Sequence, residues 1–173
     1  EDISALLEDA YALRGKRTLK AGEYSFDQSA NAFQIYDRLA RGDVYYHTVI
    51  IPEGFNVFDI ANTLDSAKLC SKADFIRTVH SEIALISDLD DQANSLEGYL
   101  FPDTYFFEPA LTPERVVEAM SNNFNEKIKA VNIKIVFSGK KLHEILTMAS
   151  ILEEEARTEE TRKMIADILW RRI

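Results

Sequence analysis

The spacing of hydrophobic and polar residues along the chain predicts a series of amphipathic helices. Apolar residues at positions 3, 6, 7, 10 and 13 recur with helical periodicity, which favours a helix over residues 2–14. A second helix is predicted after Ser71, because Ser71 is a suitable N-cap and Asp74 follows three residues later. The same reasoning predicts further helices at residues 29–40, at 57–67 with Asn56 as N-cap, at 113–131 with Pro113 at the first position, at 140–156 with Ser138 as cap, and from 159 to the end.

Short strands are predicted between some of these helices. They fall at residues 18–26, 44–51, 133–137 and within 96–107, and the second of them is rich in Val, Ile, Tyr and Thr. Because the strands are few, short and interleaved with helices, the sequence predicts an α+β fold. The polar, turn-rich stretch 87–95 predicts a boundary between two domains.

Composition narrows the possible functions. The chain has 173 residues, of which 46% are hydrophobic and 28% charged, as in ordinary globular proteins. A net charge of −9 without a basic stripe argues against nucleic acid as a partner. A single cysteine, Cys70, and three histidines without metal-ligand spacing predict no metal site. No stretch approaches the roughly 20 apolar residues that cross a bilayer. Both ends lie inside predicted helices, so we expect the chain to be part of a longer protein.

The predicted helix at residues 140–156 carries a carboxylate among its apolar positions. At 100° per residue, Glu153 lies only about 20° from Leu142, whereas Glu154 and Glu155 point away from the apolar stripe. A buried carboxylic acid favours its protonated form and can protonate a glycosidic oxygen. The alternative is that the helix ends near Glu153 and that all three glutamates are solvated. The apolar positions expected to be buried are Leu142, Ile145, Leu146, Ala149 and Ala156.

Two further segments carry groups suited to sugar binding. Residues 96–105 (LEGYLFPDTY) combine three aromatic side chains with two carboxylates, a glycine and a proline. Such groups line sugar-binding clefts, but a strand and turn whose aromatic residues fill the core would have the same composition. Residues 49–54 (VIIPEG), followed by two predicted helices, fit either a carbohydrate-binding module or plain scaffold.

These three segments, in this order, resemble the endolytic murein transglycosylase family (MltG, YceG-like). Its members carry a PEG turn before a LysM-like helical pair, which matches Pro52-Glu53-Gly54 and the helices after it. They carry an EGYLFPDTY run, which matches residues 97–105 without a break. They also carry an ASI(I/V)EKE helix, which is similar to residues 149–155, and an LKAGTY strand, which is similar to residues 19–24. The resemblance covers nearly the whole chain.

The resemblance implies a domain organisation. Residues 1–94 would form an N-terminal α+β region that includes a LysM-like α/β module at about residues 44–86. Residues 95–173 would form the first part of a mixed α+β catalytic domain. Segments that follow in the family would be missing, and with them part of its active-site cleft, as would its N-terminal transmembrane helix. The chain also has Glu154 where the family commonly has a lysine.

The activity implied by the resemblance is lytic cleavage of peptidoglycan. Family members cut the β-1,4 bond between N-acetylmuramic acid (MurNAc) and N-acetylglucosamine (GlcNAc) inside the strand, leave a 1,6-anhydro ring, and so terminate nascent strands. The family's catalytic glutamate matches Glu153, which would act first as acid and then as base. No cofactor is expected. Contacts to sugar, or orientation of Glu153, are expected from Glu97, Tyr99, Asp103, Tyr105 and Ser150.

The resemblance also implies a location and partners. The parent protein would be anchored in the bacterial cytoplasmic membrane with this part facing the periplasm or cell wall. Its partners would be peptidoglycan strands and a peptidoglycan synthase.

Three other functions stay open at this stage. The first is a non-catalytic peptidoglycan-binding or scaffold fragment. The second is aminodeoxychorismate lyase, a label sometimes given to the family; it is disfavoured because the motif segments contain no lysine and no glycine-rich phosphate loop. The third is a two-carboxylate hydrolase in which Glu97 or Asp103 partners Glu153.

Overall fold

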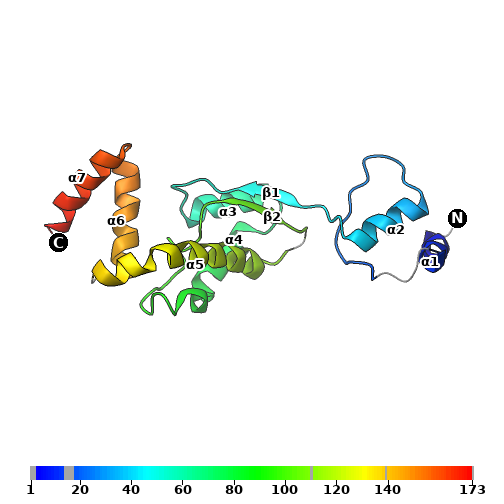
Figure 1. Cartoon of the computed structure of the whole chain (residues 1–173), viewed down its shortest axis with the longest axis horizontal. Coiled ribbons are helices and arrows are strands. Elements are labelled where there is room, and N and C mark those ends of the chain that lie inside the picture. Colours follow the sequence, from blue (N-terminus) through cyan, green and yellow to red (C-terminus); the bar gives the residue numbers. More distant parts are fainter. Residues whose placement is uncertain (1–2, 14–17, 110, 139, 173) are drawn as a thin grey trace. The chain divides into compact units, whose positions relative to one another are not determined.

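The structure is a computed structural model that describes residues 3–13, 18–109, 111–138 and 140–172. Within this part of the chain, helices predominate and two short strands form one sheet, so the predicted α+β fold is confirmed (Figure 1). In chain order the elements are α1 (Ile3–Leu13), α2 (Ala32–Arg41), β1 (His47–Ile50), α3 (Val57–Ser66), α4 (Lys72–Ser81), the 3₁₀ helix η1 (Ile83–Ile86), β2 (Thr104–Phe107), α5 (Pro113–Ser138), α6 (Leu142–Glu155) and α7 (Glu159–Trp170).

The chain divides into two compact units. The first comprises Glu1–Thr48 and Phe106–Ala110, and the second comprises Val49–Tyr105 and Leu111–Ile173. In the first unit α1 packs on α2, where the rings of Tyr11 and Tyr36 meet edge to face at 6.1 Å. This pairing places the fully buried Tyr36 at the centre of a small core.

Strands β1 and β2 are adjacent and antiparallel. The end of β1 meets the start of β2, since the amide of Ile51 donates to the carbonyl of Asp103 at 3.0 Å. Side chains alternate between the two faces, with Val49 and Tyr105 buried and Ile50 and Phe106 exposed. Residues 51–56 follow β1 and residues 97–103 precede β2. The pairing of the two strands therefore places these two segments beside each other.

The second unit is built around the packing of α3 on α4 and of α4 on α5. Most of the apolar side chains of α3 and α4 are buried there, whereas Phe58 of α3 is 58% exposed. The buried side chains of these three helices include Val57, Ile60, Ala61, Leu64, Phe75, Val79, Val116, Val117, Met120 and Phe124. Burial of this many apolar side chains makes the helices a rigid base for the loops they carry.

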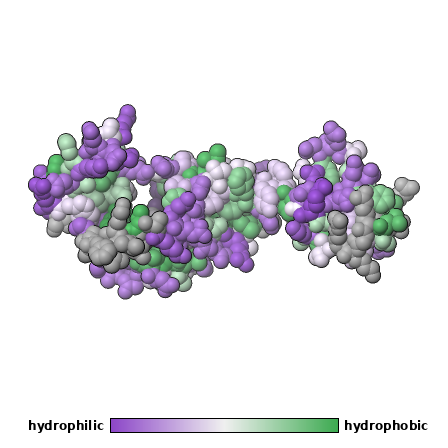
Figure 2. Space-filling view, in the orientation of Figure 1, coloured by the Kyte–Doolittle hydropathy of each residue, from purple (hydrophilic) through white to green (hydrophobic). Residues whose placement is uncertain are grey.

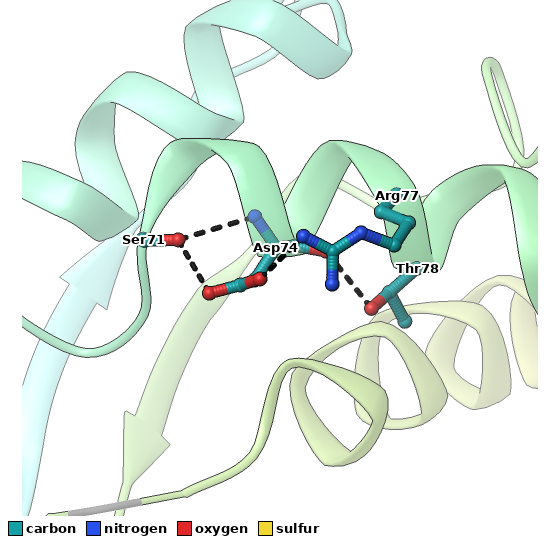
Figure 3. Close-up of polar contacts among 4 residues, drawn as sticks. All are labelled: Ser71, Asp74, Arg77 and Thr78. Carbon is teal, nitrogen blue, oxygen red and sulfur yellow. Dashed lines mark hydrogen bonds and ion pairs between the residues drawn. The ribbon is translucent and has the colours of Figure 1, made fainter.

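Helix α4 begins as the sequence predicts, at a cap formed by Ser71 (Figure 3). The Ser71 hydroxyl accepts a hydrogen bond from the Asp74 amide at 3.1 Å and donates to the Asp74 carboxylate at 2.6 Å. Arg77 pairs with the same carboxylate at 2.8 Å, and Thr78 donates to the Asp74 carbonyl at 3.0 Å. The hydrogen bond from Ser71, followed by the charge of Arg77, lowers the pKa of Asp74.

Three expectations about secondary structure were wrong. Residues 133–137, predicted as a strand, belong to α5, which continues to Ser138. Ser138 therefore ends a helix and does not cap the next one; α6 begins at Leu142 with Lys141 at the N-cap. A short apolar run has no periodicity that separates strand from helix, which explains both errors. Residues 18–26 form no strand, but an extended segment in which the Lys20 amide donates to the Leu39 carbonyl.

The predicted domain boundary at residues 87–95 falls inside the second unit. Residues on both sides of it are hydrogen-bonded, as between the Leu96 amide and the Val79 carbonyl at 3.1 Å. The division into residues 1–94 and 95–173, and the LysM-like character of residues 44–86, stay predictions. Among the described residues, no helix is both long enough and apolar enough to span a bilayer.

Candidate active site

One cleft of about 770 Å³ in the second unit brings together the three segments that the sequence predicted to carry chemistry. Its walls are the turn at residues 51–56, the loop at residues 97–102 and the face of α6 between Leu146 and Glu155, with Arg162 of α7 at the edge. In the space-filling view the cleft is a hollow between α6 and the rest of the second unit (Figure 2). Segments about fifty residues apart in the sequence therefore share one site.

The first wall is the turn that follows β1. Gly54 has φ +81°, a conformation that favours glycine because a Cβ would be strained there. The next residue, Phe55, lines the cleft with 40% of its surface exposed. The turn thus presents an apolar ring and, at Glu53, a carboxylate to the same opening.

The second wall begins with Glu97, whose carboxylate is tied to the start of α3. One of its oxygens accepts a hydrogen bond from the Val57 amide at 3.0 Å. The side chain of Asn56 accepts from the next two amides of α3, those of Phe58 and Asp59, at 2.8 and 3.1 Å. The positive end of the helix thereby stabilises a carboxylate in the cleft wall, and two of the predicted segments are held together.

The aromatic residues of this loop pack inside the protein. Tyr99 is 2% exposed, contacts Phe124 edge to face and donates its hydroxyl hydrogen to Asp90 at 2.6 Å. Burial, followed by the hydrogen bond to Asp90, raises the pKa of Tyr99. Burial alone would raise the pKa of Asp90, but hydrogen bonds from Tyr99 and from the Gln92 amide outweigh it and lower that pKa. Tyr99 therefore fixes the loop and does not line the cleft.

Tyr105 and Asp103 also lie outside the cleft lining. Tyr105 is 8% exposed and donates to the carbonyl of Phe101 at 2.6 Å. Asn123 on α5 donates to the Asp103 carboxylate at 2.9 Å and to the Tyr105 hydroxyl at 3.2 Å. The bond from Asn123 is the largest cause that lowers the pKa of Asp103, whereas burial raises that of Tyr105. Tyr99, Asp103 and Tyr105 therefore do not line the cleft, and their polar atoms form hydrogen bonds within the fold; contact of these residues with sugar stays a prediction.

The third wall is α6, on which Glu153 lines the cleft. The expectation that Glu153 is buried was wrong: its side chain is exposed, as is Ala149, while Leu142 and Ala156 are buried as predicted. Helical projection placed the apolar stripe correctly at its two ends. The middle of that stripe faces an open cleft instead of a packed core.

Other groups on α6 extend the polar surface of the cleft. Ser150 lines it and donates to the Thr147 carbonyl at 2.9 Å. Glu154 and Glu155, predicted to point away from the apolar stripe of this helix, line the same cleft. The Glu154 carboxylate lies near Gly54, so that α6 and the turn after β1 approach each other there. Of the predicted site residues, Glu97, Ser150 and Glu153 are brought together.

Several groups at the site carry no signal in the sequence. Arg162 lines the cleft from α7. Asn123 donates hydrogen bonds to Asp103 and Tyr105, and Asp90 accepts one from Tyr99. Each is an isolated polar residue on a helix or in a loop, and only the contacts formed on folding single it out. Within the described residues, no group of His, Cys, Asp and Glu side chains is arranged to hold a metal ion.

The site is therefore an open, carboxylate-lined cleft, with apolar patches, in a helix-rich α+β unit. It offers groups that exchange protons and hydrogen-bond to hydroxyls, next to an exposed ring. The family model described as "YceG-like family" matches residues 3–173, so the chain belongs to the YceG-like family.

Named relatives agree with this assignment. The chain is 27% identical, over 92% of its length, to an endolytic murein transglycosylase of Bacillus subtilis, of which it covers 49%. It is also 27% identical, over 90% of its length, to an endolytic murein transglycosylase of Streptococcus pneumoniae, of which it covers 33%. The chain thus spans half the length of these relatives or less.

A solved structure is similar to nearly the whole chain. The crystal structure of a yceG-like protein from Listeria monocytogenes matches 98% of this chain with a TM-score of 0.65 and 26% sequence identity. The chain covers 61% of that structure.

Proposed function

We propose that this chain carries the acid–base carboxyl and part of the substrate cleft of an endolytic peptidoglycan lytic transglycosylase. The observation that supports this most is that Glu153 shares one cleft with the turn at residues 51–56 and the loop at residues 97–102. The names of the Bacillus and Streptococcus relatives point the same way. Since the chain spans only part of those relatives, further segments would complete the cleft.

In the proposed reaction Glu153 serves twice. Its protonated carboxyl donates a proton to the glycosidic oxygen between MurNAc and GlcNAc as the bond from that oxygen to C1 of MurNAc breaks. The carboxylate then takes the proton of the 6-hydroxyl on the same MurNAc, whose oxygen forms the new bond to C1. The products are a 1,6-anhydro-MurNAc end and a free GlcNAc end, no water is consumed, and Glu153 is again protonated. Each proton transfer of this type contributes roughly 10²–10⁴-fold to the rate.

The open cleft is compatible with this role for Glu153. A bound glycan strand would displace water from around the carboxyl and so favour the neutral acid that the first step requires. The exposed ring of Phe55 and the hydroxyl of Ser150 lie in the same cleft, where they would stack on a sugar and hydrogen-bond to it.

The two partner carboxylates that the sequence offered for Glu153 are held by contacts of the fold. A two-carboxylate hydrolase would need a partner for Glu153, for which the sequence offered Glu97 and Asp103; Glu53, Glu154 and Glu155 line the same cleft. Glu97 uses one oxygen to hold the first amide of α3, and Asp103 is bonded to Asn123 outside the cleft. These ties reduce the availability of Glu97 and Asp103 for that role, and the proposed step is internal attack by the sugar's own hydroxyl.

The proposed activity implies a cellular location and partners for the protein. Internal cleavage of growing strands would terminate them, with this part of the protein on the cell-wall side of the bacterial membrane. A peptidoglycan synthase as partner and a membrane anchor belong to the same proposal.

The test replaces the matching segment of the Bacillus subtilis relative with residues 3–173 and digests purified peptidoglycan with the chimera. Mass spectrometry should detect internal 1,6-anhydro products, and the Glu153→Gln chimera should lose them by at least 10²-fold. Glu160→Gln is the matched control, because Glu160 is exposed on α7 and does not line the cleft. Hydrated products in place of anhydro products would establish a hydrolase. If a folded chimera binds glycan but does not cleave it, the function is that of a non-catalytic peptidoglycan-binding fragment.

A further inference from the structure

Arg162 differs from every other charged residue that lines the cleft. Among the described residues of the lining, it is the one basic side chain, and the others with charge are carboxylates. A cleft of this composition repels an anionic group everywhere except beside the guanidinium. The carboxylates are Glu53, Glu97, Glu153, Glu154 and Glu155.

The position of Arg162 is fixed by the connection between α6 and α7. Its backbone amide donates to the Thr158 carbonyl at 2.9 Å, within the first turn of α7. Its Nε donates to the carbonyl of Ala156 at 3.0 Å, where α6 ends. That carbonyl is one of those a helix terminus leaves without a partner, so the bond both satisfies it and orients the guanidinium.

The remaining N–H groups of Arg162 are available to a ligand. A guanidinium has five N–H donors, and only the one on Nε has a partner within the described part of the chain. No carboxylate described here lies within ion-pair distance of it, although five line the same cleft. A planar set of unused donors at the edge of the cleft suits the oxygens of a carboxyl or acyl group.

We infer that Arg162 recognises the acyl oxygens of the lactyl group on a muramic acid residue and thereby sets the register of the glycan strand. This inference rests on the proposed function. The two sugars of the strand differ only by the lactyl group, so an enzyme that cuts one of the two alternating bonds must detect it. Arg162 provides the attraction to the acyl oxygens, and where the stem peptide is absent the surrounding carboxylates also repel the free lactyl carboxylate from the other positions.

The experiment measures binding of two oligosaccharides to the 173-residue chain by isothermal titration calorimetry. One is a stem-free tetrasaccharide of alternating GlcNAc and MurNAc, and the other is chitotetraose, which lacks the lactyl groups. The wild-type chain should prefer the first, and Arg162→Gln should weaken its binding by roughly 10- to 100-fold while leaving chitotetraose unchanged. Arg162→Lys keeps the charge but loses the planar donors, so its affinity for the MurNAc-containing tetrasaccharide should lie between those of the wild-type chain and Arg162→Gln.

Arg157→Gln is the matched control, since Arg157 is exposed in the same connection and does not line the cleft. It should retain the full preference. Unchanged chitotetraose binding by Arg162→Gln shows that this variant is folded. A variant that keeps the preference, or that weakens both sugars equally, overturns the role of Arg162. If that happens while the chimera still produces anhydro ends, only this inference fails. If the wild-type chain binds neither sugar and the chimera does not cleave, the proposed function fails with it.

Discussion

The carboxylate of Glu97 accepts a hydrogen bond from the backbone amide of Val57, forty residues earlier in the chain, at 3.0 Å. Asn56 satisfies the next two amides, so the first turn of α3 is capped by one residue adjacent in sequence and one distant from it. The distant one lies in the cleft wall. Capping of a helix and assembly of the candidate site therefore depend on the same contact.

Removal of this contact should destabilise the chain. Glu97→Ala leaves the Val57 amide without its acceptor and should lower the free energy of unfolding by about 1 kcal/mol, the usual effect of a lost cap. Glu97→Gln keeps an acceptor oxygen but loses the charge at the helix terminus, so its effect should be smaller. Urea denaturation measures both. The same change at Glu126, exposed on α5, should be nearly neutral. An equal effect at the two sites would show that the bond contributes nothing.

Gly98 should tolerate a side chain poorly for backbone reasons alone. Its φ is +84° and nothing lies within 4 Å of where a Cβ would be, so Gly98→Ala introduces strain without a clash. The expected loss of stability is about 1–2 kcal/mol. Gly98→Asn should cost less, because asparagine adopts this conformation more readily. Thermal unfolding of the two variants tests the order, and equal midpoints would contradict it.

The hydrogen bond between Tyr99 and Asp90 should make stability depend on pH. The pKa of Asp90 is lowered in the folded chain, so its contribution is present at neutral pH and lost as pH falls through that lowered value. Tyr99→Phe should cost about 1.5–3 kcal/mol near pH 7, as for a hydrogen bond to a charged group, and less in acid. Unfolding in urea at several pH values measures the difference.

Tyr105→Phe provides the control for this pH dependence. The Tyr105 hydroxyl donates to a backbone carbonyl, which does not titrate, so the cost of its removal should vary less with pH. A Tyr99→Phe effect that is the same at pH 7 and in acid would show that the Asp90 charge is not involved.

Cys70 should be a slow nucleophile in the folded chain. Burial raises the pKa of its thiol to about 11, with further increases from the charges of Asp74, Asp65 and Glu114. Compared with the ordinary value of 9.0, the thiolate fraction at pH 7–8 is roughly 100-fold smaller, and alkylation by iodoacetamide should slow in proportion. Asp74→Asn should accelerate the reaction, since it removes a negative charge. The urea-unfolded chain should react at the ordinary rate; equal rates for folded and unfolded chains would contradict the prediction.

Local interactions explain which parts of the fold were predictable. The caps at Asn56 and Ser71 and the proline at the start of α5 act within one turn of their own helices, so the sequence places them correctly. Residues 133–137 were wrongly predicted as a strand. Their apolar run suits either structure, and the continuation of α5 decided between them.

The candidate site was predictable in part for the same reason. Periodicity places Glu153 on the same side of α6 as Leu142, and residue chemistry singles out Glu97 and Ser150. Neither periodicity nor residue chemistry shows whether that side of α6 packs against the protein or faces an opening. Tyr99 and Tyr105 are of a residue type common in sugar-binding sites, but both side chains are buried and the ring of Tyr99 packs against Phe124 of α5.

The sequence by itself determined most of the helices, the caps at Asn56 and Ser71, the α+β class and three segments whose resemblance to one family proved correct. These features depend on neighbours along the chain. Tertiary structure decided that the three segments meet in one cleft, that Glu97 caps α3, and that Arg162 lines the same cleft as five carboxylates. It did so because the adjacent strands β1 and β2, and the buried faces of α3, α4 and α5, bring distant residues together, and no local spacing encodes such contacts.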